Sequence, residues 1–167
     1  MSTYATPQAL LDRFSAEEIA QRADRGTPRL VTAALLTAAV AGGDLSGYTA
    51  PEQAAVAAAL TQIAWALSDA DDAIDGWLAV RYTVPIVSPP HVLVRVACDM
   101  ARYYLYDDQV TEVIQKRYDA AERLCRDLAS GKLSLGSAVD AFSPATGAVA
   151  EISSDGSVFH RTKRGGL

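Results

Sequence analysis

Apolar residues recur at helical spacing along most of the chain. The longest such pattern covers Pro51–Val80, and two more cover Pro89–Tyr106 and Val110–Ser130. Because positions three and four apart lie on one face of a helix, these repeats predict three amphipathic helices that pack through their apolar faces. We expect the buried core to include ten residues of those faces: Leu60, Ile63, Leu67, Ile74, Leu93, Val96, Met100, Ile114, Ala121 and Leu128.

Shorter helical patterns precede these three. A Thr-Pro pair at residues 6–7 begins one of them, and Ser15 followed by Glu18 has the spacing of a capping box, in which both side chains bind N–H groups at a helix start. A second Thr-Pro pair at residues 27–28 predicts the start of an Ala-rich helix that ends at Gly42–Gly43. The predicted fold class is therefore all-α, a small helical bundle.

The helical pattern stops after Gly136. Short β-prone runs at residues 148–153 and 157–162 flank Asp155–Gly156, a dipeptide typical of two-residue hairpin turns. An isolated hairpin buries too little apolar surface to be stable in water, so we expect the order of this segment to depend on neighbouring subunits. We divide the chain into a helical domain, residues 1–141, and an extended C-terminal interaction tail, residues 142–167, that contains the hairpin.

Composition narrows the class of protein. The chain has 167 residues, of which half are apolar, and a net charge of -5. A protein that binds nucleic acid mainly through phosphates needs a basic surface, which this balance argues against. Cys98 and Cys125 stand among apolar residues and are expected to be buried free thiols. No apolar run reaches the ~18 residues of a membrane span and no secretory leader is recognised, so we expect a soluble, cytoplasmic protein.

A run of aspartates raises the question of a metal site. Asp71, Asp72 and Asp75 spell D-D-x-x-D, a string that can hold magnesium over a diphosphate in isoprenoid synthases. On a helix, however, Asp71 lies near the apolar face, Asp75 at its margin, and Asp72 points outward. We therefore favour a structural role, in which Asp75 pairs with Arg81 or Arg102 and clamps the helices together. No metal or cofactor is expected.

The predicted helix Pro89–Tyr106 contains a candidate ion pair and a group of tyrosines. Asp99 and Arg102 stand at i, i+3, the spacing of an ion pair within one helix. The tyrosine-rich segment 103–106 is expected to pack in the core or an interface rather than to stack nucleotides.

An ordered set of short motifs resembles one family. The motifs are I-D-x-x-L-x-x-R-Y-x-x-P, a Pro-Pro pair, A-x-D-x-A-R-Y-x-L, R-Y-x-x-A and G-K-x-x-L-G. They begin here at Ile74, Pro89, Ala97, Arg117 and Gly131. Together they resemble the family of tailed-phage and prophage proteins typified by the Mu-like head–tail joining protein. The Ala-rich stretch at Gly26–Pro51 departs from the family, whose members often carry a shorter, more polar segment there.

The resemblance implies a structural virion protein rather than an enzyme. Such a connector would sit at the virion neck as a ring of about a dozen copies. It would contact the portal protein on one side and a tail, stopper or terminator protein on the other, and DNA would pass through without sequence-specific binding. Before assembly the protein would be in the host cytoplasm. The residues we expect at structural contacts or interfaces are Asp75, Arg81, Tyr82, Asp99, Arg102, Tyr103, Phe159, Arg161, Lys163 and Arg164.

Two other function classes remain open from the residues alone. One is a helical metal-dependent enzyme that uses Asp71, Asp72 and Asp75, which a magnesium titration would reveal. The other is a small helical regulator that binds proteins through the tyrosine-rich segment 103–106. Electron microscopy separates a regulator from a connector, because only a connector should form a ring at the neck.

Overall fold

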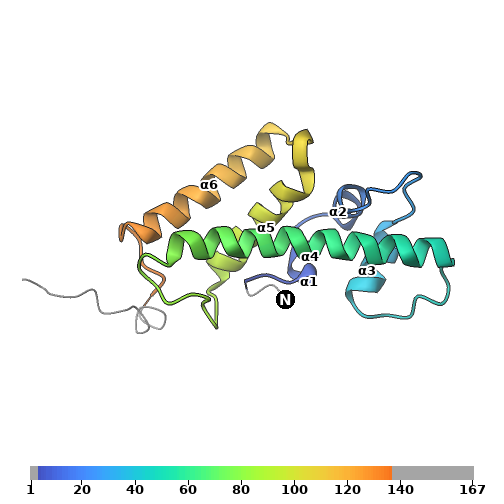
Figure 1. The fold of residues 1–167 in the computed structure, drawn as a ribbon, viewed down its shortest axis with the longest axis horizontal. Helices are drawn as coiled ribbons and strands as arrows, with labels where there is room; N and C mark the ends of the chain where they lie inside the picture. The colour runs from blue at the N-terminus through green and yellow to red at the C-terminus, as the bar shows by residue number, and fades with distance from the viewer. Residues whose placement is uncertain (1–3, 137–167) are drawn as a thin grey trace, which may run out of the picture.

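The computed structural model describes residues 4–136, and this part of the chain is helical, without strands (Figure 1). The elements in chain order are α1 (Pro7–Leu11), α2 (Ala16–Ala23), α3 (Ala33–Val40), α4 (Ala50–Leu78), α5 (His91–Tyr106), the 3-10 turn η1 (Asp107–Gln109) and α6 (Glu112–Ala129). The predicted all-α class is confirmed. The predicted tail, its hairpin and the boundary between residues 141 and 142 lie outside the described residues.

The long helix α4 extends along the molecule, and the other helices pack against it (Figure 1). Helix α5 lies on α4, and α6 folds back over α5 to form a helical hairpin with η1 at its turn. Helices α1 and α2 each contact both α4 and α5, while α3 packs against α2 and α4. This arrangement makes α5 the helix that touches α2 on one side and α6 on another.

The three long predicted helices are confirmed, with ends that differ by at most two residues. Helix α4 begins at Ala50 because the backbone N–H and the hydroxyl of Thr49 both donate to the Glu52 carboxylate, each at 2.7 Å. Helix α5 begins at His91, after Pro90 rather than at Pro89. Proline favours an extended conformation in the residue before it, which places Pro89 outside the helix.

The predicted core is also confirmed for nine of the ten residues that define it. Only Leu60 is half-buried, and it packs against the edge of the same cluster. Residues from α1 to α6 contribute to one continuous apolar core, so the described residues form a single packed unit.

The predicted start of the Ala-rich helix at residues 27–28 is wrong. Helix α3 begins at Ala33, and the hydroxyl of Thr32 accepts a hydrogen bond from the N–H of Leu35 at 3.2 Å. A buried aspartate, Asp24, holds the preceding segment in a loop instead. Its carboxylate accepts hydrogen bonds at 2.7–2.8 Å from three backbone N–H groups, those of Gly26, Leu30 and Val31.

These bonds also change the acidity of Asp24. Burial by itself raises the pKa of this carboxyl, but the three N–H donors outweigh burial and leave the pKa below its ordinary value. The charged form is thus the one that the loop binds. The predicted end of the helix is confirmed: α3 ends at Val40, and Gly42 follows with φ of +68°, which favours glycine.

Candidate interface on helix α5

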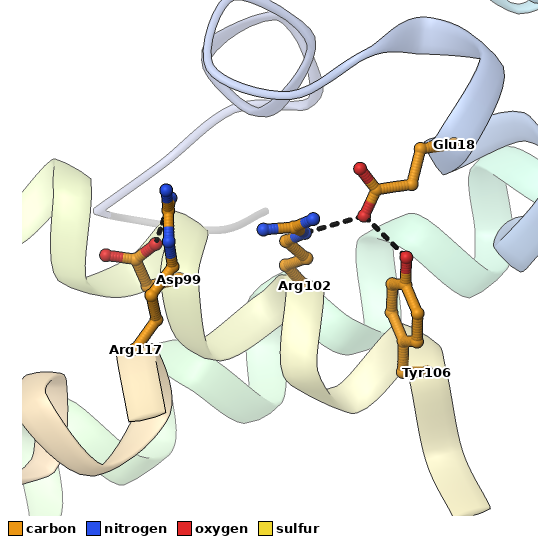
Figure 2. Close-up of polar contacts among 5 residues, drawn as sticks. All are labelled: Glu18, Asp99, Arg102, Tyr106 and Arg117. Atoms are coloured by element: carbon orange, nitrogen blue, oxygen red, sulfur yellow. Dashed lines mark hydrogen bonds and ion pairs between the residues drawn. The ribbon is translucent and has the colours of Figure 1, made fainter. Parts of the chain in front are cut away.

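A hydrogen-bonded ion pair joins α2 to α5. The Nε of Arg102 donates to Oε1 of Glu18 at 2.6 Å, and the hydroxyl of Tyr106 donates to the same oxygen at 2.8 Å (Figure 2). The Arg102 guanidinium also lies over the Phe14 ring, 4.5 Å from its centroid. Because the Arg102 and Glu18 side chains are only 15% and 23% exposed, solvent screens this pair weakly.

A second cation adds to this contact between α2 and α5. The guanidinium of Arg22 lies 4.2 Å from the centroid of the Tyr106 ring, and its Nη1 donates to Gln109 at 2.9 Å. We call Glu18, Arg22, Arg102 and Tyr106 the α2–α5 seam.

The seam corrects two predictions. Ser15 is the N-cap of α2 but makes no side-chain capping bond, and Glu18 binds α5 rather than its own helix start. The predicted capping box is therefore wrong, because the same carboxylate gains a stronger, charge-assisted partner in Arg102. The expected pairing of Arg102 with Asp75 is wrong for the same reason.

Asp99 connects α5 to α6 instead of pairing within its own helix. Its carboxylate lies 3.7 Å from the Nη1 of Arg117, whose exposed side chain comes from α6 (Figure 2). Burial raises the pKa of Asp99, and the positive charges of Arg117 and Arg95 only partly offset it. Asp99 and Arg102 therefore do not pair with each other: Asp99 contacts α6 and Arg102 contacts α2.

Two tyrosines of α5, Tyr103 and Tyr104, pack against α6. Tyr103 stacks on Tyr118 with ring centroids 4.1 Å apart and an interplanar angle of 24°. Tyr104 meets both rings edge-on, at 5.8 and 5.9 Å. These are the offset and T-shaped geometries that aromatic rings prefer. The segment was predicted to pack in the core or an interface, and Tyr103 and Tyr104 pack between α5 and α6.

The aspartates of α4 bind the N-terminal segment. The hydroxyl of Tyr4 donates to Asp75, and its backbone N–H lies 3.4 Å from both carboxylate oxygens of Asp71. The N–H of Ile86 donates in turn to the Tyr4 hydroxyl at 3.2 Å. Burial raises the pKa of Asp75; the Tyr4 hydrogen bond acts in the opposite direction, and the charges of the neighbouring aspartates add to the increase.

The predicted pairing of Asp75 with an arginine is therefore wrong, because the hydroxyl of Tyr4 binds the Asp75 carboxylate instead. The orientations inferred for the run are confirmed, since Asp71 is buried, Asp75 is half-buried and Asp72 is exposed. Within residues 4–136 no group of three His, Cys, Asp or Glu side chains is placed to hold a metal ion.

Arg81 and Tyr82 follow the end of α4. The Arg81 guanidinium lies 5.8 Å from the centroid of the Tyr82 ring. Its Nη1 lies only 2.6 Å from the position that a Cβ on residue 131 would occupy, so Gly131 leaves room for the guanidinium. Tyr82 is buried, and its hydroxyl has no hydrogen-bond partner in the described part of the chain. Arg81 therefore packs against the turn after α6, while Tyr82 is part of the apolar core.

The structure separates the predicted residues into two groups. Asp99, Arg102 and Tyr103 lie on α5, whereas Asp75, Arg81 and Tyr82 lie at the end of α4 and just after it. The four tail residues, from Phe159 to Arg164, lie outside the described residues. Sequence reasoning missed the partners that complete these contacts, which are Tyr4, Arg22, Tyr106, Arg117 and Tyr118.

Both cysteines are buried free thiols, as predicted. Burial raises the pKa of each thiol to about 11, which keeps both neutral at physiological pH. Over the stretch from residue 4 to residue 136, no helix combines the length and the apolar character that crossing a membrane requires.

Comparison with known proteins confirms the predicted resemblance. The model of the family described as "Bacteriophage Mu, Gp36" matches residues 4–153. The "Mu-like prophage FluMu protein gp36" of Haemophilus influenzae is 34% identical over 122 residues, which cover 65% of this chain and 86% of the relative. "Gene product J" of Escherichia phage Mu is 36% identical over 101 residues, which cover 60% of this chain and 72% of the relative.

Proposed function

Since the chain belongs to the bacteriophage Mu Gp36 family, we propose that it is a structural or assembly protein of a Mu-like phage or prophage, and specifically the head–tail connector. In this role it forms a ring of about a dozen copies between the portal protein and the tail, stopper or terminator protein. It acts through contacts rather than through catalysis. It is placed at the virion neck, with a stage in the host cytoplasm during assembly.

The observation that carries the proposal is the family match over residues 4–153, which spans every described helix. The ordered motifs on which the resemblance rests fall on helix-packing positions. Asp99, Arg102 and Tyr103 join α5 to its neighbours, and Tyr82 packs beneath Arg81. These motif residues therefore hold the helices together, which suits a protein whose task is to present surfaces to others.

Exposed apolar side chains support contact with other proteins. Trp65 on α4 is 60% exposed, and Val87 in the loop before α5 is 91% exposed. Burial of a large apolar side chain stabilises the complex that buries it, and tryptophan is among the residues most enriched at interface centres. We assign Trp65 to a contact between subunits or with a neighbouring neck protein.

The negative net charge of the chain is consistent with a ring through which DNA passes without binding. With a formal charge of -5, and with exposed carboxylates such as Asp69 and Asp72 on α4, the chain offers DNA few attractive contacts. A ring lined by such surfaces would repel the phosphate backbone and let DNA slide.

Electron microscopy of particles tests the proposal. Gold-labelled protein in intact virions is expected at the neck, and removal of the gene is expected to leave filled heads and free tails unjoined. A Trp65→Asp variant is expected to fold but to restore joining poorly, whereas the exposed Thr61→Asp variant on the same helix serves as its matched control. A label confined to the capsid or tail tip, or infectious particles without the protein, would rule out the connector.

A further inference from the structure

A cavity of about 430 Å³ opens between the corner that links α1 to α2 and the helices α5 and α6. Three arginines line it, one from each of these elements: Arg13, Arg95 and Arg117. Among the described residues Asp99 is the only acidic one that lines it, and Phe14 contributes an apolar wall. The cavity thus concentrates positive charge on a chain that is acidic as a whole.

Asp99 leaves most of this positive charge unmatched. Its only ion pair in residues 4–136 is the contact with Arg117 at 3.7 Å, which is longer than a hydrogen bond. Arg95 and Arg13 form no ion pair with Asp99 in the described part of the chain, and their positive charges only act to lower its pKa. Within residues 4–136 the lining therefore carries three positive charges and one negative charge.

The neighbouring arginine is already neutralised. Arg102 lies close enough for its charge to act on Asp99, but its Nε is bonded to Glu18 at 2.6 Å. Arg102 is therefore committed to Glu18, and the three arginines that line the cavity are separate from this pair.

We propose that this arginine-lined cavity binds a carboxylate presented by an acidic segment of a partner protein. A guanidinium offers two parallel N–H donors that match the two oxygens of a carboxylate, and three of them around one hollow give a specific anion site. The Phe14 wall accommodates the aliphatic part of a glutamate side chain. The inference goes beyond the connector role, because the cavity would bind a carboxylate in any assembly that the chain joins.

A protein carboxylate suits the cavity better than the backbone of DNA. Binding to DNA relies on basic residues spread along a surface, each at a phosphate, whereas here three exposed arginines line a single hollow. The negative charge of the rest of the chain also repels a polyanion of that length.

Nuclear magnetic resonance of the full-length, ¹⁵N-labelled protein tests this proposal. The probe is a short blocked peptide of glutamates, and the signals followed are the Nε–Hε groups of Arg13, Arg95 and Arg117. These signals are expected to shift saturably, with a dissociation constant in the millimolar range that increases with sodium chloride.

Two substitutions with opposite expected effects make the test specific. Arg95→Gln removes one donor and is expected to weaken peptide binding roughly tenfold. Asp99→Asn removes the competing carboxylate and is expected to tighten binding, which no purely structural role of Asp99 would produce. Arg123→Gln, an exposed arginine of α6 outside the cavity, is the matched control and is expected to bind like wild type.

Three results would overturn the proposal. One is peptide binding that is equal in wild type and Arg95→Gln, and another is a titration that moves none of the three cavity arginines. The third is tighter binding of inorganic phosphate or duplex DNA than of the peptide, which would assign the cavity to a phosphate ligand. Circular dichroism of each variant confirms that the helices are intact. None of these results bears on the location of the protein in particles.

Discussion

Removal of the Glu18 carboxylate is expected to destabilise the fold more than any other single change at the α2–α5 seam. Glu18→Ala deletes the acceptor shared by Arg102 and Tyr106, at 2.6 and 2.8 Å. The Arg102 side chain is 15% exposed, so little water can replace the lost carboxylate. The variant therefore leaves a largely buried positive charge and a largely buried hydroxyl without their partner.

The size of the effect follows from this burial. Loss of one partner of a fully buried ion pair costs about 3–5 kcal/mol. Here both side chains keep some contact with solvent, and Arg102 keeps its position over the Phe14 ring, so we expect a loss of about 2–3 kcal/mol in the free energy of unfolding. For a chain of this length, that loss corresponds to a melting temperature lower by roughly 5–10 °C.

Urea denaturation followed by circular dichroism measures this loss, and Glu17→Ala is the matched control. Glu17 is in the same first turn of α2, but it is exposed, and its side chain accepts a hydrogen bond from Gln21 at 3.0 Å within its own helix. Both changes remove one negative charge near the helix N-terminus, so the difference between them isolates the tertiary contact. We expect the control to lose less than ~0.5 kcal/mol. Equal losses in the two variants would refute the role given to Glu18.

Three further changes test other contacts. Tyr4→Phe removes the hydroxyl bound to Asp75 and is expected to lower the free energy of unfolding by ~1–3 kcal/mol in urea; an unchanged midpoint would contradict this anchor. Burial raises the pKa of Asp75 above 3.8 in the folded protein. The stability that Asp75 contributes is therefore complete below pH 3.8, and it is lost as the pH rises through the pKa of the folded state. Asp75→Asn should therefore flatten the dependence of the melting temperature on pH, and an unaltered dependence would exclude Asp75 as its source. Gly131→Ala places an alanine at φ of +78° and crowds Arg81, so we expect the free energy of unfolding to fall by ~1–2 kcal/mol in the same urea assay. Gly47→Ala is the control, because a Cβ at that position meets open space. Equal losses in the two variants would contradict the predicted strain.

The fold was predictable where the signal is local. The apolar repeats of α4, α5 and α6 identified nine of ten core residues, because a buried helical face leaves a regular spacing in the sequence. Prediction failed at residues 24–32, where the Thr-Pro pair resembles a helix start. There the chain forms a loop around Asp24, whose three backbone donors leave no regular pattern to read.

The candidate interface shows the limit more clearly, because each polar residue has several potential partners and only the fold selects one. Glu18 has a local capping role available, yet it binds a residue 84 positions away. Asp99 and Arg102 have the spacing of a local pair, yet one contacts α6 and the other α2. Helix α5 lies between those two helices, so residues three apart on it face different neighbours. Because α5 faces two neighbours, Arg102 pairs with Glu18 in the α2–α5 seam, whereas Arg13, Arg95 and Arg117 line the cavity beside Asp99. The excess positive charge of the cavity therefore follows from the packing of α5 and not from any motif in the sequence.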